Sequence, residues 1–138
     1  MDIREVTPRY SVSPQITPED IAAIKAAGFT TVICNRPDEE NPPELQAAAV
    51  QAAAEAAGLE FVNIPLTYPT MTPEKIAQQM AAVSGPTLAY CASGTRCTTI
   101  WALAQAGSGM AVDDILTTAA KAGYDLAQLR PRLEDIAG

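Results

Sequence analysis

The chain alternates short apolar stretches with longer segments that carry helix start and stop signals. Residues 29–34 and 59–66 read as β-strands, because β-branched and other large apolar side chains cluster there. Residues 44–58, which lie between them, are rich in alanine and end at a glycine, as many helices do. A strand, a helix and a further strand in this order favour a parallel sheet with helices packed on it.

The alternation continues along the whole chain. Thr-Pro-Glu opens two of the predicted helices, with the threonine as cap and the proline in the first helical position. The predicted strands are residues 10–13, 29–34, 59–66 and 86–91, and the predicted helices are residues 17–28, 44–58, 72–85, 96–106, 111–123 and a last segment from Asp125 that Pro131 kinks or splits. We therefore expect residues 1–138 to form one α/β domain, with three α/β/α layers and a mostly parallel sheet of about four strands covered by helices on both faces.

Charge and cysteine content exclude several kinds of partner and site. The formal net charge of −7 repels phosphate backbones and anionic lipid, so neither nucleic acid nor a membrane is expected as a partner. No apolar stretch approaches the ~20 residues of a membrane span, and the N-terminus lacks an apolar signal core, so a cytoplasmic location is expected. The chain has no histidine, and its three cysteines lack the spacing of a zinc site, so no metal or cofactor is expected.

Ligands bind beyond the carboxyl ends of the strands in sheets of this kind. Three loops leave those ends, at residues 35–43, 67–71 and 92–95. The third loop follows an apolar strand, precedes a helix and belongs to the hexapeptide Cys-Ala-Ser-Gly-Thr-Arg, residues 91–96. We expect the chemistry of the protein at this loop.

The hexapeptide contains the parts of an anion-binding site around a reactive thiol. Cys91 precedes a helix N-terminus, whose exposed amides lower the pKa of a thiol and favour the thiolate. Gly94 allows the backbone to turn its N–H groups inward, and Arg96 adds a planar charged fork suited to oxyanions. The predicted anion-binding loop consists of Ala92, Ser93, Gly94, Thr95 and Arg96.

Two enzyme superfamilies place a cysteine, a short loop and an arginine between a strand and a helix: the tyrosine and dual-specificity phosphatases, and the rhodanese sulfurtransferases. The whole chain resembles a bacterial family between them, which also forms the N-terminal domain of the beta-lactamase hydrolase-like proteins, beside a persulfide dioxygenase domain. The stretches SVSPQITPEDIAAIKAAGFTTVICNRPDEE, YCASGTRCTTIWALAQA and GYDLAQLRPRLE carry the resemblance. It implies a cysteine-phosphatase-like fold, with strand 86–91 between strands 29–34 and 59–66, and Cys91 and Arg96 as catalytic residues.

Loop length separates the two reactions that the resemblance leaves open. The phosphatase signature has five residues between cysteine and arginine, whereas this chain has four, like many single-domain rhodaneses. A tighter ring of amides suits a terminal sulfur better than a phosphoryl group with three oxygens. The residue before Cys91 is Tyr90, where phosphatases of this type usually have histidine. Both features favour sulfur chemistry.

Phosphate ester hydrolysis also needs a general acid to protonate the leaving oxygen. Residues 66–71 contain no carboxylate. Asp38 is the nearest candidate, with Glu39 and Glu40 in reserve. Sulfite is a weak base and leaves without such an acid, so this absence again favours sulfur transfer.

The function predicted first is therefore a rhodanese-type sulfurtransferase. The Cys91 thiolate attacks thiosulfate or a low-molecular-weight persulfide, Arg96 and the loop amides stabilise the persulfide, and a thiol acceptor removes the sulfur. The alternative is a tyrosine or dual-specificity-like phosphatase, in which Cys91 carries a thiophosphate formed from a phosphate ester and Asp38 is the acid. A third reading is a sensor of anions or persulfides without turnover.

Two more cysteines are open to two interpretations each. Cys97 follows Arg96, where phosphatases usually have serine or threonine. It is either a resolving or relay thiol for Cys91 or a small residue that packs in the first helical turn. Cys34 is expected to be a buried structural thiol, with a place beside Cys91 at the rim of the site as the alternative.

Of three further side chains outside the hexapeptide, Arg36 and Tyr68 are candidates for the rim of the site. Arg36 either widens the anion site or pairs with Asp38 and braces the loop that contains both. Tyr68 and Trp101 are expected to be packing or rim residues. The oligomeric state is left open by the sequence.

Overall fold

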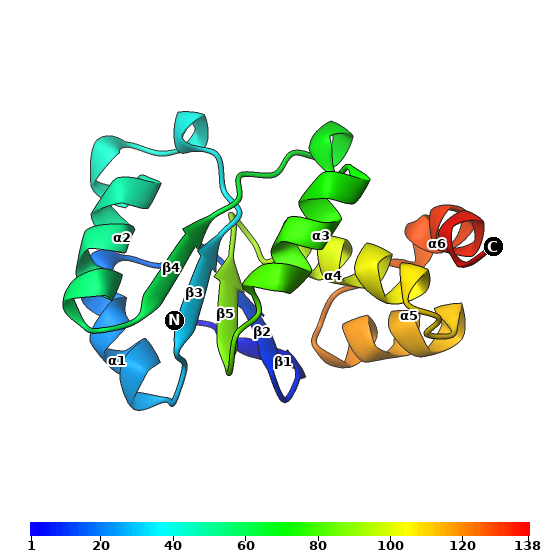
Figure 1. The fold of residues 1–138 in the computed structure, drawn as a ribbon, viewed down its shortest axis with the longest axis horizontal. Helices are drawn as coiled ribbons and strands as arrows, with labels where there is room; N and C mark the ends of the chain where they lie inside the picture. Colours follow the sequence, from blue (N-terminus) through cyan, green and yellow to red (C-terminus); the bar gives the residue numbers. More distant parts are fainter.

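The computed structural model describes residues 1–138 and contains a five-stranded sheet flanked by helices (Figure 1). The strands are β1 (Arg4–Thr7), β2 (Tyr10–Ser13), β3 (Thr31–Cys34), β4 (Glu60–Asn63) and β5 (Thr87–Tyr90). Neighbouring strands are parallel, except that β1 pairs antiparallel with β2. The predicted three layers and mostly parallel sheet are confirmed, and all four predicted strands are present.

Strand β1 is the one that the sequence patterns missed. It lies at the edge of the sheet, and Val6 is the only buried residue among its four. An edge strand has one side open to solvent and needs no apolar run, so Arg4 and Glu5 are tolerated there. The sheet therefore has five strands rather than about four.

The strand order is β1-β2-β5-β3-β4, which corrects the expected position of β5. Strand β5 lies between β2 and β3, whereas the family resemblance placed it between β3 and β4. Burial explains the order. Every residue of β2, β3 and β5 is buried, while β4 has no fully buried residue and occupies the other edge.

Helices cover both faces of the sheet (Figure 1). They are α1 (Ile21–Ala26), α2 (Ala47–Ala56), α3 (Pro73–Ala82), α4 (Thr95–Gly107), α5 (Val112–Lys121) and α6 (Arg130–Ala137), with 3₁₀ turns at Pro18–Asp20, Asp38–Glu40, Pro43–Leu45, Tyr68–Thr70 and Ala127–Leu129. Helices α1 and α2 pack on one face, and α3 to α6 lie on the other. None of these helices combines the length and the hydrophobicity needed to cross a membrane.

Helix α4 is enclosed by protein on almost all sides. Nine of its 13 residues are buried, because α3, α5 and α6 all pack against it. Its alanines and threonines are small enough for this close approach. The helix that follows the hexapeptide is therefore fixed on the sheet, and so is the N-terminus that it presents to Cys91.

Pro131 lies in the first turn of α6. A first-turn residue has no intrahelical partner for its N–H, so proline fits there without bending the helix. The segment predicted from Asp125 thus divides into a 3₁₀ turn and a helix, and Pro131 marks the start of the second rather than a kink.

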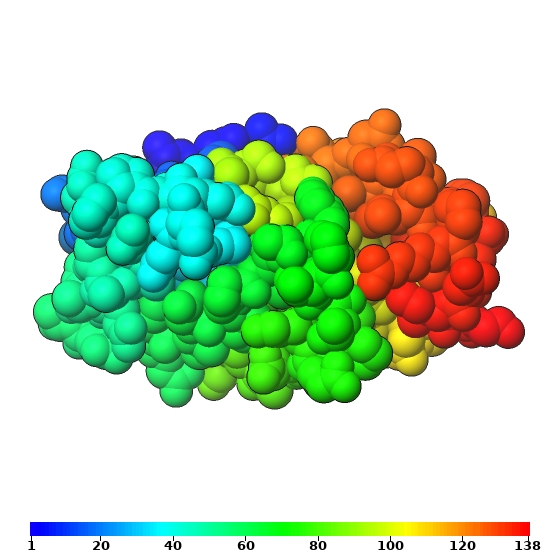
Figure 2. Space-filling view, turned by 90° about the horizontal axis from the view of Figure 1, so that it is seen from above, coloured from blue at the N-terminus to red at the C-terminus, as the bar shows by residue number.

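The loops at the carboxyl ends of the parallel strands meet on one surface of the molecule. Figure 2 views this surface and shows the yellow-green segment after β5 between the cyan segment after β3, the green segment after β4 and the orange segment after α5. Hydrogen bonds join the same segments, from Arg96 to Glu40 and Leu66 and from Tyr124 to Ser93. The predicted location of the chemistry is thus a meeting point of four segments.

Candidate active site

Cys91 lies directly after β5, at the start of the loop to α4. Its side chain is fully buried, and its sulfur accepts a hydrogen bond from the N–H of Gly94 at 3.1 Å. Gly94 has a φ angle of 92°, a conformation that residues with a side chain rarely adopt. A Cβ atom at this position would also collide with the hydroxyl of Tyr124. That hydroxyl donates to the carbonyl of Ser93 at 3.0 Å. The loop therefore turns its N–H groups toward the sulfur, and Tyr124 holds it from outside.

These donors change the ionisation of Cys91, whose pKa is lowered to about 5. The largest cause is a hydrogen bond from the Cys97 side chain, and burial opposes it by disfavouring the charged form. The backbone N–H groups of Cys97, Ser93 and Gly94 add to the stabilisation of the thiolate. Cys91 is thus ionised at neutral pH, which is the nucleophilic form of cysteine.

Cys97 occupies the first turn of α4 and is fully buried. Its thiol donates to Cys91, and burial raises its own pKa, so it remains protonated while Cys91 is ionised. The two cysteines are free thiols. Cys97 thus lies where phosphatases have a hydroxyl, in a position that stabilises the Cys91 thiolate.

Arg96 points its guanidinium toward two other segments. Nη1 donates to the carbonyl of Leu66 at 2.9 Å, and Nη1 and Nη2 each donate to one carboxylate oxygen of Glu40 at 2.8 Å. This fork geometry fixes the plane of the guanidinium, and its hydrogen bonds lower the pKa of Glu40. Arg96 is thus held beside the loop by a bidentate ion pair with an ionised carboxylate.

A hollow of about 450 Å³ opens next to Arg96. It is lined by Glu40, Thr67, Tyr68, Pro69, Ser93 and Arg96. Tyr68 belongs to the 3₁₀ turn after β4 and is half exposed, so the structure places it on the wall of this hollow. A small anion entering here meets the charge of Arg96 and, from the 92–95 loop, Ser93.

Asp38 lies at the start of the 3₁₀ turn that also contains Glu40. Its carboxylate accepts a hydrogen bond from the N–H of Ala47 at 2.9 Å, at the N-terminus of α2. A carboxylate in this position satisfies a helix N–H group and benefits from the helix dipole. The contacts of Asp38 are therefore those of a helix cap, while Glu40, a reserve candidate in the sequence, is the carboxylate that faces Arg96.

A family model described as the beta-lactamase hydrolase-like protein, phosphatase-like domain, matches residues 2–108. The chain belongs to this family. A beta-lactamase hydrolase-like protein of Agrobacterium fabrum is 33% identical over 133 residues, which cover 94% of this chain and 31% of that protein. The chain spans about a third of the length of the curated relatives it matches.

Solved structures share the fold of this phosphatase-like domain. A candidate phosphatase from Neisseria meningitidis Z2491 has a TM-score of 0.86 and 34% identity, with 99% of each chain covered. The core catalytic domain of a PP-IP phosphatase from S. cerevisiae has a TM-score of 0.71 and 13% identity, covering 97% of this chain and 84% of that chain. The second likeness concerns the fold alone. The three-layer fold is therefore that of the cysteine phosphatases, as the resemblance implied.

Arg36 does not pair with Asp38 in this phosphatase-like domain. Its Nε donates to Glu40 at 3.2 Å, and its Nη1 donates to Gln15 at 3.3 Å. Glu40, four positions further along the chain, is close enough to pair with Arg36. The carboxylate of Asp38 instead turns toward α2. Arg36 thus contacts its own loop through Glu40, the carboxylate that also holds Arg96.

Cys34 is buried on the opposite face of the sheet from Cys91. In the β3–β5 register Cys34 is opposite Tyr90, so Cys91, one residue later, points to the other side. Cys34 packs with residues of α1 and α2. Cys91 and Cys97 belong to the apolar cluster on the other face, which includes most of α4. Cys34 is therefore a buried thiol on the face of the sheet away from Cys91. No group of three or more His, Cys, Asp or Glu side chains could hold a metal ion.

Sequence reasoning missed a buried polar network behind the loop. The hydroxyl of Tyr10 donates to the carbonyl of Cys97 at 2.7 Å and accepts from Gln79 at 3.1 Å. Gln79 and Asn35 exchange two hydrogen bonds, of 2.8 and 2.9 Å. Because all these side chains are buried, their partners fix them in one arrangement. In the sequence, this network is visible only as polar residues within or beside apolar segments. That pattern does not reveal which residues are hydrogen-bond partners.

Proposed function

We propose that this chain is a cysteine-dependent phosphatase that acts on small phosphate esters through a covalent thiophosphate on Cys91. The observation that carries the proposal is a cysteine with a pKa of about 5, surrounded by loop N–H groups and followed by Arg96. These are the parts needed to form and stabilise a covalent intermediate on sulfur. The family membership and the phosphatases among the similar structures support the same reaction.

In the proposed reaction the Cys91 sulfur attacks phosphorus, and the bond from phosphorus to the leaving oxygen breaks. The N–H groups of residues 92–96 and the guanidinium of Arg96 bind the phosphoryl oxygens. Water then attacks phosphorus, and the bond to sulfur breaks, which releases phosphate and restores the thiolate. No metal or cofactor takes part.

The side chains near Cys91 set the class of ester. The segment after β4 has no carboxylate, Asp38 caps α2, and Glu40 is ionised in its pair with Arg96. None of these groups is a ready proton donor, so the leaving oxygen must be a weak base. We therefore expect aryl phosphates and phosphoanhydrides to react faster than alkyl phosphates.

The same features support a second function, a rhodanese-type sulfurtransferase. The loop has four residues between Cys91 and Arg96, and sulfite departs from thiosulfate without an acid. In this reaction the Cys91 sulfur attacks the outer sulfur of thiosulfate or of a low-molecular-weight persulfide. The bond to sulfite or to the thiolate breaks, and a thiol acceptor later removes the persulfide sulfur. Three free thiols suit the reducing, cytoplasmic setting that we propose for either function.

Aryl phosphate hydrolysis and thiosulfate-to-thiol sulfur transfer, measured side by side, test both functions. Intact-protein mass spectrometry after rapid quenching identifies the adduct on Cys91 as a phosphoryl group or a single sulfur atom. Cys91→Ser should abolish the reaction, and Cys34→Ser serves as the matched cysteine control. A sulfur adduct with no phosphatase activity overturns the first proposal in favour of the second. Full activity of Cys91→Ser in both assays overturns both.

A further inference from the structure

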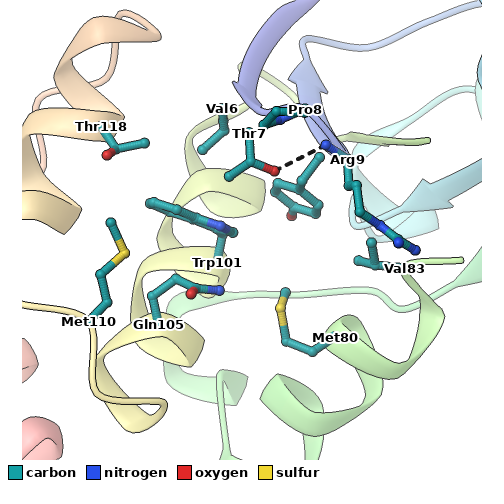
Figure 3. Close-up of a pocket in the computed structure, with 11 residues that line it drawn as sticks. Val6, Thr7, Pro8, Arg9, Met80, Val83, Trp101, Gln105, Met110 and Thr118 are labelled. Carbon is teal, nitrogen blue, oxygen red and sulfur yellow. Dashed lines mark hydrogen bonds between the residues drawn. The ribbon is translucent and has the colours of Figure 1, made fainter. Parts of the chain in front are cut away.

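A second hollow of about 530 Å³ lies at the opposite end of the parallel strands from Cys91 (Figure 3). It is bordered by the turn between β1 and β2, the end of α3, one side of α4 and α5. Its lining includes Val6, Arg9, Met80, Trp101, Gln105 and Met110. The volume falls in the range of small-molecule sites. None of these residues takes part in the function proposed above.

The walls of this hollow, which we call the Trp101 pocket, are mainly apolar. Figure 3 shows Trp101 in the centre, with Met110 on one side and Met80 and Val83 on the other. Indole and thioether groups adapt to flat apolar ligands, because both are polarisable and methionine is flexible. The body of a ligand here would be an aliphatic or aromatic group.

Two polar groups in the Trp101 pocket lack partners within the protein. Trp101 is only 3% exposed, and its indole N–H, which is not itself buried, donates no hydrogen bond to another protein group. The side-chain amide of Gln105, one turn further along α4, is half-buried and also has no hydrogen-bond partner in the protein. Both groups line the pocket and are not buried by protein, so the acceptor of a ligand that enters it can receive hydrogen bonds from them.

Charge selects the kind of acceptor. The protein has a net charge of −7, yet the residues that line the Trp101 pocket include no aspartate or glutamate. Arg9 is their only charged residue, and it takes part in none of the ion pairs of the protein. An unpaired guanidinium at the edge of an apolar pocket favours an anionic group on the ligand.

We propose that the Trp101 pocket binds a small organic carboxylate with an apolar, flat body. The apolar part packs against Trp101, Met80 and Met110. The carboxylate accepts hydrogen bonds from Arg9 and from the free donors of Trp101 and Gln105. Such a site is separate from the Cys91 loop, so its success or failure is independent of the reaction proposed there.

Trp101 is the only tryptophan of the chain, so its fluorescence reports on this pocket directly. Titration with 3-phenylpropionate should give a saturable change in emission. Because Arg9 is exposed, Arg9→Gln should weaken binding by about two- to fivefold, as expected for an exposed charge pair. The neutral amide, 3-phenylpropionamide, should bind weakly and equally to wild type and to Arg9→Gln.

Amide and indole N–H chemical shifts, recorded during the same titration, locate the ligand without relying on fluorescence. Shifts centred on Arg9, the Trp101 indole and Gln105 support the proposal. Shifts confined to residues 91–96, and lost in Cys91→Ser, would assign the carboxylate to the anion loop instead. Shifts confined to the anion loop would overturn the proposal. So would equal affinity of wild type and Arg9→Gln, or the absence of any saturable shift.

Discussion

Cys91 and Cys34 stand at the same end of neighbouring parallel strands, and their properties are opposite. The pKa of Cys91 is lowered to about 5, whereas burial raises the pKa of Cys34. One residue of register places Cys91 against the helix that follows it and Cys34 against α1 and α2. A strand end is therefore not enough to make a thiolate. The glycine turn, the N–H groups of the loop and the thiol of Cys97 make the difference.

Substitution of the two cysteines gives the largest expected contrast. Cys91→Ser should lower turnover by at least about 10³-fold, because the nucleophile of the covalent step is removed. Cys34→Ser should leave turnover within about twofold, since its side chain lies on the far face of the sheet. Steady-state kinetics on the same substrate measure both. A large loss in Cys34→Ser with an intact thermal unfolding midpoint would contradict the separation of the two faces.

Gly94→Ala disrupts the glycine turn that surrounds Cys91 and has no counterpart at Cys34. A left-handed φ angle costs a non-glycine residue of the order of 1–3 kcal/mol, and the new methyl group collides with Tyr124. The displaced N–H groups should reduce turnover by about 10²-fold, as loss of oxyanion donors does. Turnover and the unfolding free energy are measured together. The double variant with Tyr124→Phe relieves part of the collision and should recover part of the activity.

Cys97→Ala removes the largest single stabilisation of the Cys91 thiolate. A hydrogen bond to a charged group is worth about 1.5–3 kcal/mol, so the pKa of Cys91 should rise by about one to two units. Alkylation of Cys91 by iodoacetamide should slow markedly at pH 6 and little at pH 9. Cys97→Ser keeps a donor and is the matched control. Identical pH profiles for Cys97→Ala and wild type would contradict the stabilisation of the Cys91 thiolate by Cys97.

Glu40→Gln should have the smallest effect, because the Glu40 carboxylate is partly exposed. The substitution removes the charge that occupies two N–H groups of Arg96. Inorganic sulfate, which competes for the same guanidinium, should inhibit Glu40→Gln a few-fold more strongly than wild type. Inhibition constants at constant ionic strength measure this. Glu39→Gln, a neighbouring exposed substitution, controls for net charge, and equal inhibition of both variants would contradict the proposed competition.

The sequence was most informative where the signal is local. Helix caps, β-branched runs and the Cys91–Arg96 hexapeptide lie within a few residues, so the elements and the loop could be predicted. The strand order and the face of Cys34 depend on which strands pair, and a run of four residues does not contain that information. The Glu40–Arg96 pair joins residues 56 positions apart, so sequence reasoning reached Glu40 only as a reserve acid. β1 was missed because three of its four residues are not buried.

The central claim is that Cys91 is a thiolate at neutral pH and Cys34 is not. Thiolate absorbance near 240 nm, recorded as pH is raised, should show one transition with a midpoint near pH 5 that is absent in Cys91→Ser. Because the pKa is lowered, the Cys91 thiolate is fully present above this midpoint and lost below it. A transition near the ordinary thiol value of about 8.5 for Cys91 would contradict the account.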